Sequence, residues 1–358
     1  MTVTSGRLPD PRPDLALREG YHSPQVDVEV RLNTNESPLA PPEGWVAELQ
    51  AAIGATDFHR YPDRRATALR GALADLHGVD VAQVFVANGS NEVLQSVLLG
   101  YGGPGRRALT FEPTYALHAH IAHLTGTEVV TAPRRDDFSV DPDAAADAAA
   151  SLDAAVTFLC SPNNPTGNGE DRATVAAVLA AAPGLVVVDE AYGQFADWSA
   201  LELVDDATPL VVTRTFSKTW SMAAMRLGYA VAAAPVVEVL ERVALPYHLD
   251  AVKQQAGLLA VAHVAEMEAR VGLIVRERER LVAALGRLPV TVWPSQANFV
   301  LFRPERRNGR DVWQGLVDRS VLVRDTSSWP GLGGCLRVTV GTPDENGRFL
   351  AALGEVLA

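Results

Sequence analysis

The chain of 358 residues is nearly devoid of lysine, because only Lys218 and Lys253 among its 31 basic residues are lysines. Lysine is normally one of the commonest residues, so this scarcity indicates a bias that places arginine wherever a positive charge suffices. Arginine stays protonated, whereas a lysine amine can lose its proton and form a Schiff base with a carbonyl. The two retained lysines are therefore the first candidates for chemistry that arginine cannot perform.

Other absences exclude whole classes of protein. The net charge of −12 lacks the basic footprint of a nucleic-acid binder. Two cysteines, Cys160 and Cys335, cannot build a disulfide framework and have no CxxC spacing. The opening segment MTVTSGRLPDPRPD has no signal-peptide core, and Pro183 and Gly184 interrupt the most apolar stretch. We expect a cytoplasmic globular protein of two domains, with neither membrane spans nor nucleic-acid partners.

Short apolar runs alternate with helical patterns between residues 84 and 233, among them VFVA, AVTFLC, LVVVDE and LVVTRTF. Each run is expected to be a strand followed by a helix. This pattern predicts an α/β fold with a mostly parallel central sheet and helices on both faces. After Pro246, a long charged helix over 266–285 precedes shorter strands. We expect an N-terminal arm (1–40) that joins the small domain, a large domain (41–245) and a small α+β domain (246–358).

A glycine-containing turn lies between an apolar strand and a helix at residues 85–101. Free backbone N–H groups around Gly89, Ser90 and Asn91, together with the positive end of the helix dipole, suit a phosphate. From these residues alone, an ordinary helix capped by Ser90 or Asn91 is the better interpretation. The segment supports a phosphate site only in combination with the other motifs of the chain.

Two further segments follow predicted strands, at the edge where open α/β sheets bind ligands. Residues 160–168, CSPNNPTGN, form a rigid loop that presents Asn164, although by itself such a loop is usually only a turn. Asp189 ends another strand, and a buried carboxylate needs a partner such as a protonated ring nitrogen. Tyr192, three residues later, can lie near the same site and hydrogen-bond a phenolic oxygen there. In isolation, Asp189 is better explained as the cap of a following helix.

The segment VVTRTFSKTWSMAAMRLGY, residues 211–229, distinguishes the two lysines. Lys218 follows an apolar strand between the hydroxyls of Thr215 and Ser217. Arg226 comes eight residues later, about two turns on if the intervening chain is helical. Hydroxyls and a guanidinium suit a phosphate, and an amine suits an aldehyde. Lys253, in DAVKQQA, is interpreted as a solvated helix position.

In this order, SPNNPTG, the Asp-x-x-Tyr at a strand end and Ser-Lys followed by Arg226 resemble the fold-type I aminotransferases that use pyridoxal 5′-phosphate (PLP). The resemblance covers residues 21–341. Within that family, YHSPQVDVEVRLNTNESP, RYPD, EPTYALH, PYHLD and VLVRD resemble the histidinol-phosphate aminotransferases. The resemblance implies amino transfer from L-histidinol phosphate to 2-oxoglutarate, which yields imidazole acetol phosphate and glutamate in histidine biosynthesis.

The resemblance also implies residue roles. Lys218 would bond covalently to PLP, Asp189 would pair with the pyridine nitrogen, and Tyr115 would stack on the ring. Tyr192 and Asn164 would bind the ring oxygen O3′. The cofactor phosphate would be held by Gly89, Ser90, Asn91, Thr215, Ser217 and Arg226, with Tyr61 from a neighbouring subunit. A homodimer with shared active sites follows from that last role.

Substrate contacts are implied at four positions. Arg337 would bind the anionic end of the substrate and Arg324 the phosphate of histidinol phosphate, while Tyr21 and Asn35 would lie near the substrate. Two guanidinium groups suit a dianion better than a single carboxylate does. An aromatic amino-acid aminotransferase on the same scaffold is the nearest alternative. A PLP-dependent decarboxylase of phosphorylated amino acids is another alternative. A PLP-sensing regulatory domain fused to a DNA-binding module is disfavoured, because no helix-turn-helix precedes the aminotransferase-like region and no basic tract is present.

Some residues depart from this pattern or stand apart from it. Ser37 interrupts the Asn-Glu-Asn-Pro that is frequent in the family, and SMAAM at 221–225 replaces a Leu-Ala-Gly-Leu pattern. His118, His120 and His123 do not share one helix face, so we expect a structural or solvated role for them rather than metal ligation.

Overall fold

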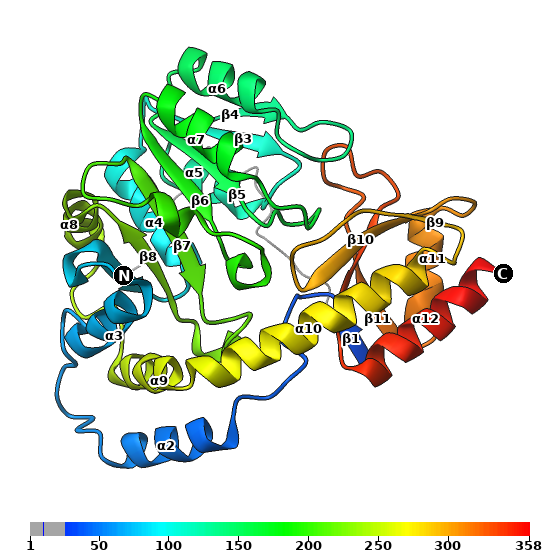
Figure 1. The fold of residues 1–358 in the computed structure, drawn as a ribbon, viewed down its shortest axis with the longest axis horizontal. Helices are drawn as coiled ribbons and strands as arrows, with labels where there is room; N and C mark the ends of the chain where they lie inside the picture. Colours follow the sequence, from blue (N-terminus) through cyan, green and yellow to red (C-terminus); the bar gives the residue numbers. More distant parts are fainter. Residues whose placement is uncertain (1–9, 11–25) are drawn as a thin grey trace, which may run out of the picture.

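The computed structural model describes residues 10 and 26–358, which form two lobes (Figure 1). The larger lobe contains a seven-stranded sheet in the order β2-β8-β7-β6-β5-β3-β4, and the smaller a five-stranded sheet in the order β1-β11-β12-β10-β9. The long helix α10 (Val264–Leu285) runs from one lobe to the other. The sequence predicted this helix closely.

The large sheet is mostly parallel, as predicted. Its strands are β2 (Val84–Ala87), β3 (Arg107–Glu112), β4 (Glu128–Pro133), β5 (Val156–Cys160), β6 (Leu185–Asp189), β7 (Leu210–Thr215) and β8 (Gly228–Ala232). Neighbours from β4 to β7 are parallel, and only β8 runs against its neighbours β7 and β2. Every residue of β5, β6 and β7 is buried, which explains their continuous apolar runs.

Alternate residues of these strands point to opposite faces of the sheet, and each face carries its own helices. Phe158 and Val187 face the core under α4 (Ser90–Tyr101), α5 (Leu117–Leu124) and α8 (Ala234–Val243). Leu159 and Val188 face α6 (Pro142–Ser151) and α7 (Arg172–Ala181). A third core joins β2 and β8 to α2 (Glu43–Gly54), α3 (Thr67–His77) and α9 (Ala251–Ala262). Helices on both faces are thus confirmed.

The small lobe combines the C-terminal part of the chain with one strand from its N-terminal part. Its strands are β1 (Val30–Leu32), β9 (Val290–Val292), β10 (Phe299–Pro304), β11 (Val321–Asp325) and β12 (Leu336–Thr339), and its helices are α11 (Gly309–Val317) and α12 (Pro343–Leu357). Strand β1 pairs in parallel with β11, so residues 30–32 complete the edge of a sheet made almost 300 positions later. Buried Phe299, Phe302 and Phe349 fill the core beneath.

A helix does not follow every strand of the large sheet, which corrects that part of the prediction. Only the 3-10 turns η2 (Gly193–Phe195) and η3 (Ala200–Leu203) follow β6, and η4 (Ala223–Met225) is the only helical turn between β7 and β8. The chain from Lys218 to Arg226 is therefore not two turns of α-helix. Strand β8 returns antiparallel beside β7, and Ser221 and Arg226 have positive φ angles that turn the chain.

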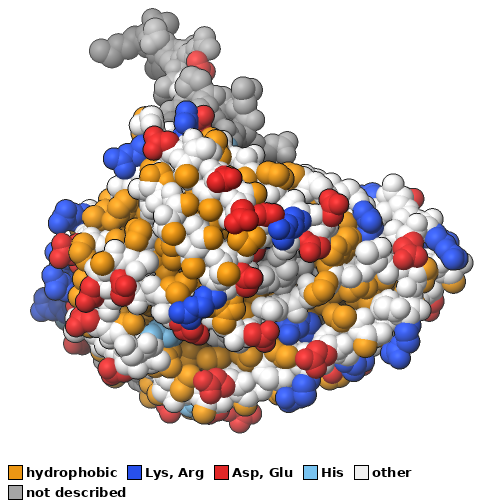
Figure 2. Space-filling view, turned by 45° about the horizontal axis from the view of Figure 1, so that its top comes forward, with side chains coloured by type: hydrophobic (Ala, Val, Ile, Leu, Met, Phe, Trp, Pro, Cys, Tyr) orange, Lys and Arg blue, Asp and Glu red, His pale blue; other side chains and the backbone are white. Residues whose placement is uncertain are grey.

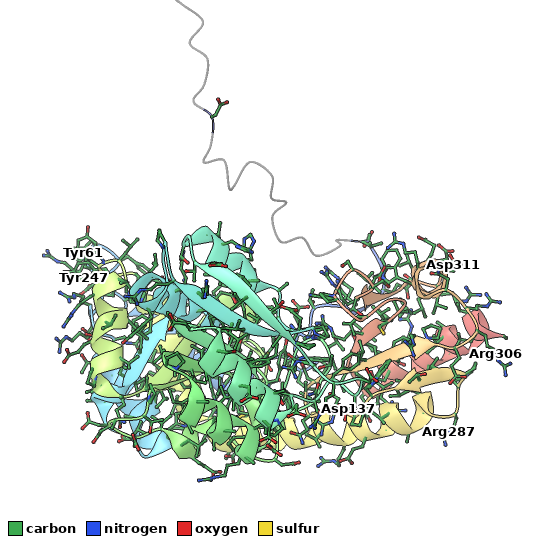
Figure 3. The ribbon with its side chains drawn as sticks, turned by 90° about the horizontal axis from the view of Figure 1, so that it is seen from above. Tyr61, Asp137, Tyr247, Arg287, Arg306 and Asp311 are labelled. Atoms are coloured by element: carbon green, nitrogen blue, oxygen red, sulfur yellow. The ribbon has the colours of Figure 1, made fainter. Side chains whose placement is uncertain are left out.

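Charged side chains of both signs are interspersed over the face shown in Figure 2, without a broad basic area. No helix within residues 26–358 is long and apolar enough to cross a membrane. Tyr61 and Tyr247 lie at the end of the large lobe that is farthest from Arg306 and Asp311 of the small lobe (Figure 3).

Candidate active site

Most of the residues singled out from the sequence line one cavity of about 230 Å³, where the large sheet meets residues of the small lobe. Strands β5, β6 and β7 are parallel, so their carboxyl ends deliver Cys160, Asp189 and Thr215 to the same edge. The cavity is lined by Asn33, Thr34, Asn35, Ser90, Asn91, Tyr115, Cys160, Asn164, Asp189, Ala191, Tyr192, Thr215, Ser217, Lys218, Arg226 and Arg337.

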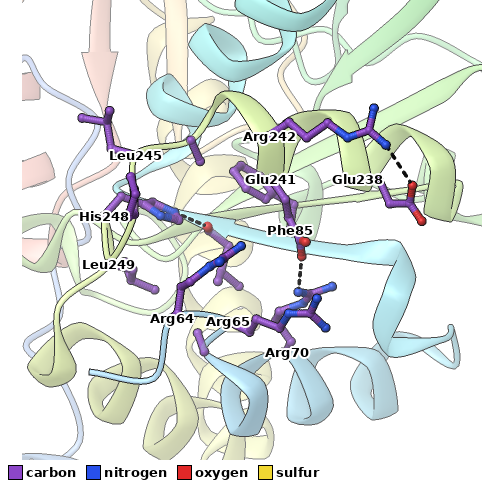
Figure 4. A pocket seen from close by; sticks show the side chains of 14 residues that line it. Arg64, Arg65, Arg70, Phe85, Glu238, Glu241, Arg242, Leu245, His248 and Leu249 are labelled. Carbon is purple, nitrogen blue, oxygen red and sulfur yellow. Dashed lines mark hydrogen bonds and ion pairs between the residues drawn. The ribbon is translucent and has the colours of Figure 1, made fainter. Parts of the chain in front are cut away.

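A larger cavity of about 510 Å³ lies elsewhere, behind β2 (Figure 4). Its walls carry Arg64, Arg65 and Arg70 from one side and Glu238 and Glu241 from α8. Arg70 is paired with Glu241, so part of this charge is already neutralised. None of the residues with a predicted catalytic or cofactor role lines it, and the smaller cavity is the better candidate for the chemistry.

At one end of the smaller cavity, the turn before α4 forms a cradle of donors. Gly89 has φ 84° and a Cβ placed there would lie 3.1 Å from Arg226 Nη2, so a side chain would crowd the guanidinium. Arg226 Nη1 donates to Ser217 Oγ at 3.2 Å, and Ser217 Oγ lies 3.0 Å from Thr215 Oγ1. Backbone N–H groups at a helix start, two hydroxyls and a guanidinium together suit a phosphate.

Asp189 also lines the cavity and is 1% exposed. Its Oδ2 lies 2.9 Å from His118 Nε2, and because a carboxylate only accepts, this nitrogen carries the hydrogen. Its Oδ1 accepts from Thr213 Oγ1 at 3.2 Å and from the Ala191 N–H at 3.1 Å. Three hydrogen bonds to the carboxylate fix its position, so Asp189 is not merely a helix cap.

His118 was not identified as a functional residue from the sequence. It is fully buried, stacks on Phe158 with ring centroids 4.8 Å apart, and meets the Tyr115 ring edge-on at 5.4 Å. Its role could not be inferred from the helix that contains it, because its partner Asp189 is 71 positions away in the sequence. Tyr115 precedes α5 and His118 lies in its first turn, so the local pattern carried no signal for their contact.

Lys218 lines the same cavity. Burial and the positive charges of Arg337 and Arg226 lower the pKa of its amine to about 7, although Glu36 opposes the shift. Its Nζ donates to the Thr34 carbonyl at 3.2 Å and lies 5.7 Å from the centroid of the Tyr192 ring. An amine with this pKa is substantially unprotonated at neutral pH, which makes it a nucleophile or a base.

Tyr192 and Asn35 are joined in the cavity wall. Asn35 Nδ2 donates to Tyr192 Oη at 2.9 Å, while Asn35 Oδ1 accepts from Thr339 Oγ1 of β12 at 3.1 Å. Burial raises the pKa of the Tyr192 phenol, so it keeps its proton and can donate. Tyr115 Oη donates to Asn91 Oδ1 at 3.3 Å, which ties this ring to the cradle.

Arg337 reaches the cavity from β12 and is 5% exposed. It donates to Asn164 Oδ1 and, at 2.9 Å, to the Asn33 carbonyl, and its guanidinium lies 5.1 Å from the Phe299 ring centroid. Arg324 on β11 is its register partner, so both side chains leave the same face of the sheet. The Arg324 guanidinium lies 5.6 Å from the centroid of the Trp329 ring.

Four predicted residues are not among those that line this cavity. Gly89 directly precedes the lining residue Ser90, and Arg324 lies opposite Arg337 on β11. Tyr61 is 80% exposed and stacks on Tyr247 with centroids 4.6 Å apart. Tyr21 lies outside the described residues. Lys253 is also corrected: its side chain is only 23% exposed, and its Nζ donates to Asn88 Oδ1 at 2.8 Å, so it is not a solvated helix position.

Comparisons with known proteins agree with this geometry. Residues 27–353 match the model of the family described as aminotransferase class I and II. The chain belongs to that family. It is 48% identical to a histidinol-phosphate aminotransferase of Thermobifida fusca over 353 residues, covering 96% of this chain and 94% of that protein. A histidinol-phosphate aminotransferase of Frankia casuarinae is 47% identical, with 94% and 87% covered.

A solved relative confirms the fold. The crystal structure of histidinol-phosphate aminotransferase from Sinorhizobium meliloti in complex with PLP superposes with a TM-score of 0.84, at 24% identity, covering 92% of this chain and 91% of that one. The resemblance to the histidinol-phosphate aminotransferases that the motifs indicated is thus confirmed by the relatives of higher identity.

The donor set of the cavity fits PLP. The cradle at Gly89–Asn91 with Arg226 suits the phosphate, the Lys218 amine suits the aldehyde, and the Asp189 carboxylate suits a protonated pyridine nitrogen. The three groups lie in one cavity with the Tyr115 ring on its wall. No part of this donor set conflicts with the cofactor that the fold family uses.

Proposed function

We propose that the protein transfers the amino group of L-histidinol phosphate to 2-oxoglutarate with PLP as cofactor, forming imidazole acetol phosphate and glutamate. The observation that carries the substrate choice is the pair Arg324 and Arg337, opposite one another on β11 and β12. Two guanidinium groups suit a phosphate dianion. Relatives at 47–48% identity over nearly the whole chain are histidinol-phosphate aminotransferases, which supports the same conclusion.

The cofactor contacts belong to this proposal. Lys218 would bond to PLP, Asp189 would hold the proton on the pyridine nitrogen, and Tyr115 would cover the ring. Tyr192 and Asn164 would donate to O3′, each already held by a further contact, to Asn35 and Arg337 respectively. The phosphate would be bound by Gly89, Ser90, Asn91, Thr215, Ser217 and Arg226.

Bound PLP supplies an electron sink for the bond broken at the substrate Cα. The protein moves the protons. The Lys218 amine would act as the base that removes the Cα proton of the substrate and would later return a proton, which its lowered pKa allows at neutral pH. Asp189, held in place by His118 and Thr213, would pair with the protonated ring nitrogen.

Substrate binding would use arginines from strands β11 and β12 of the small lobe. Arg337 would bind the carboxylate of glutamate or 2-oxoglutarate, and Arg324 together with Arg337 the phosphate of histidinol phosphate. Asn35 stands beside Tyr192 in the cavity wall. Tyr21, outside the described residues, would add a contact from the N-terminal arm.

The proposal includes a homodimer in the cytoplasm, with Tyr61 serving the phosphate of the partner's cofactor. The exposed large side chains Phe58, Tyr61, Leu245 and Tyr247 support a subunit contact, because such side chains are rarely left in water together. Mixing Tyr61→Ala with Lys218→Ala protomers tests it. Restored activity in the hybrid requires Tyr61 to act across the interface, since only then does each hybrid dimer contain one intact site. Two separately inactive variants that stay inactive when mixed would refute the shared site.

The substrate is tested by adding L-histidinol phosphate or L-phenylalanine, separately, to the PLP-loaded enzyme without an amino acceptor. We expect L-histidinol phosphate to abolish the visible absorbance of the loaded enzyme at far lower concentration. A preference for L-phenylalanine would instead identify an aromatic amino-acid aminotransferase, and release of CO₂ would identify a decarboxylase. Lys218→Ala is the control, because without the amine that moves the Cα proton neither substrate should abolish the visible absorbance.

A further inference from the structure

Asn88 occupies the turn between β2 and α4, directly before the cradle residue Gly89, and is held from behind by Lys253. The Lys253 Nζ lies 2.8 Å from Asn88 Oδ1 and 3.0 Å from Asp250 Oδ2. A tetrahedral ammonium can donate to both oxygens at once. The second retained lysine of the chain thus touches the loop next to the first lysine's site.

Both the amide nitrogen and the amide oxygen of Asn88 have hydrogen-bond partners, and the kinds of partner fix the orientation of the amide. Its Nδ2 donates to Glu92 Oε2 at 2.8 Å and to the His248 carbonyl at 2.9 Å, both of which can only accept. Its Oδ1 faces the ammonium, which can only donate. The Asn88 N–H also donates to Glu92. These four contacts lock the backbone at the point where it enters the cradle.

Two cations therefore contact adjacent residues of the loop. Arg226 lines the cavity and its Nη2 lies 3.1 Å from where a Gly89 Cβ would stand, whereas Lys253, which does not line the cavity, contacts Asn88. Gly228 of β8 completes the packing, because a Cβ there would lie 2.4 Å from the Ser90 nitrogen. Small displacements of this loop would spoil the convergence of its N–H groups on an anion.

We propose that Lys253 is a positioning residue for the cofactor phosphate: through Asn88 it holds residues 88–91 in the conformation that binds the phosphate, and it adds positive charge behind them. This inference rests on the proposed function, because it takes the cradle to bind the phosphate of PLP. It also explains why a lysine persists here in a chain that otherwise uses arginine. A compact ammonium reaches two oxygens in a space where the planar guanidinium fork has a different geometry.

A purely structural role for Lys253 is the competing explanation. Lys253 pairs with Asp250, whose side chain caps α9 by accepting from the Lys253 N–H at 2.8 Å. If this pairing were all that the side chain did, its removal would alter the stability of α9 but would not discriminate between ligands with and without a phosphate. A comparison of PLP with pyridoxal, which lacks the phosphate, separates the two roles.

The experiment measures dissociation constants of PLP and of pyridoxal for the apoprotein by absorbance titration. We expect Lys253→Met to weaken PLP binding roughly tenfold, the loss typical of one hydrogen bond to a charged group, and to leave pyridoxal binding unchanged. Lys253→Arg, which keeps the positive charge but not the geometry of the ammonium, should recover only part of the affinity for PLP. Arg319→Met is the matched control, since it removes an exposed cation paired with Glu355 in the small lobe.

The possible results distinguish the two proposals. Unchanged PLP affinity in Lys253→Met, or equal weakening of PLP and pyridoxal, would overturn the role of Lys253 while the wild-type protein still binds PLP. A wild-type apoprotein that does not prefer PLP to pyridoxal would instead refute the proposed cradle, and with it this inference. Thermal unfolding of the apo variants shows whether a loss of affinity follows from a loss of folded protein.

Discussion

Arg324 and Arg337 are register partners on the antiparallel strands β11 and β12. Like charges directly opposite each other on one sheet face are destabilising, by a few tenths of a kcal/mol up to about 1 kcal/mol. Under the proposed function, the phosphate of the substrate would bind beside these two groups and offset the repulsion.

Arg324→Met should lower kcat/KM for L-histidinol phosphate on the order of 100-fold, the loss expected when one partner of a buried charge contact is removed. The loss for L-histidinol, which has no phosphate, should be much smaller. Steady-state kinetics with both substrates measure this difference. Equal losses for the two would show that Arg324 does not contact the phosphate. Arg319→Met should change neither value.

The lowered pKa of Lys218, about 7, predicts how PLP loading depends on pH. Only the neutral amine attacks an aldehyde, so the rate of PLP incorporation into the apoprotein should rise as the pH increases through about 7 and then level off. Stopped-flow absorbance would measure this rate at about ten pH values between roughly 5.5 and 9. A midpoint near the ordinary lysine value of 10.5 would contradict the structure.

His118 should affect turnover more than cofactor binding. His118→Phe removes the 2.9 Å contact to Asp189 Oδ2 and should lower kcat by roughly 10- to 100-fold, while PLP still binds. His118→Gln places an amide N–H near the position of the imidazole Nε2 and should recover part of the rate. If His118→Phe lost activity only by failing to bind PLP, the orienting role would be wrong.

His77 makes folding sensitive to acid. Burial, aided by the charge of Arg214, lowers its pKa from 6.5 to about 4, and its Nε2 lies 2.8 Å from Tyr229 Oη. The unfolded chain therefore binds a proton between these values that the folded protein does not. Stability is fully present above pH 6.5 and falls as the pH decreases toward about 4.

Urea unfolding at several pH values tests this prediction. The contribution lost on acidification should be about 2 kcal/mol once the partial exposure of the ring is allowed for. His77→Phe should lower stability at neutral pH by about 1 kcal/mol, through the lost hydrogen bond, but flatten the acid decline. An unchanged decline in this variant would assign the acid sensitivity to other groups.

The sequence revealed those site residues whose positions follow from local rules. Asp189 and Lys218 each follow an apolar strand, and strands of a parallel sheet end at one edge, so their meeting could be inferred. The mostly parallel sheet itself followed from runs such as LVVVD, which are apolar because they are buried on both faces.

Contacts between distant segments could not be inferred in this way. His118 and Asp189 are 71 positions apart, Asn35 and Tyr192 are 157 apart, and Asn88 and Lys253 are 165 apart. Nothing in the neighbourhood of Lys253 distinguishes it from a solvated helix residue. The segment from Lys218 to Arg226 is a reversal of the chain rather than the helix considered from the sequence. The reversal arises because β8 pairs antiparallel with β7, which depends on sheet order rather than on local pattern.

The positions of the two lysines have a practical consequence for labelling. Lys218 lines the cavity and Lys253 contacts Asn88 beside the cradle, and the sequence contains no other lysine. Under the proposed function, acylation of these side-chain amines would report cofactor occupancy, read by mass spectrometry at two positions. The same property makes common lysine-directed coupling to dyes or resins unsuitable for preserving this enzyme, whereas its many arginines leave guanidine-directed reagents a broad target.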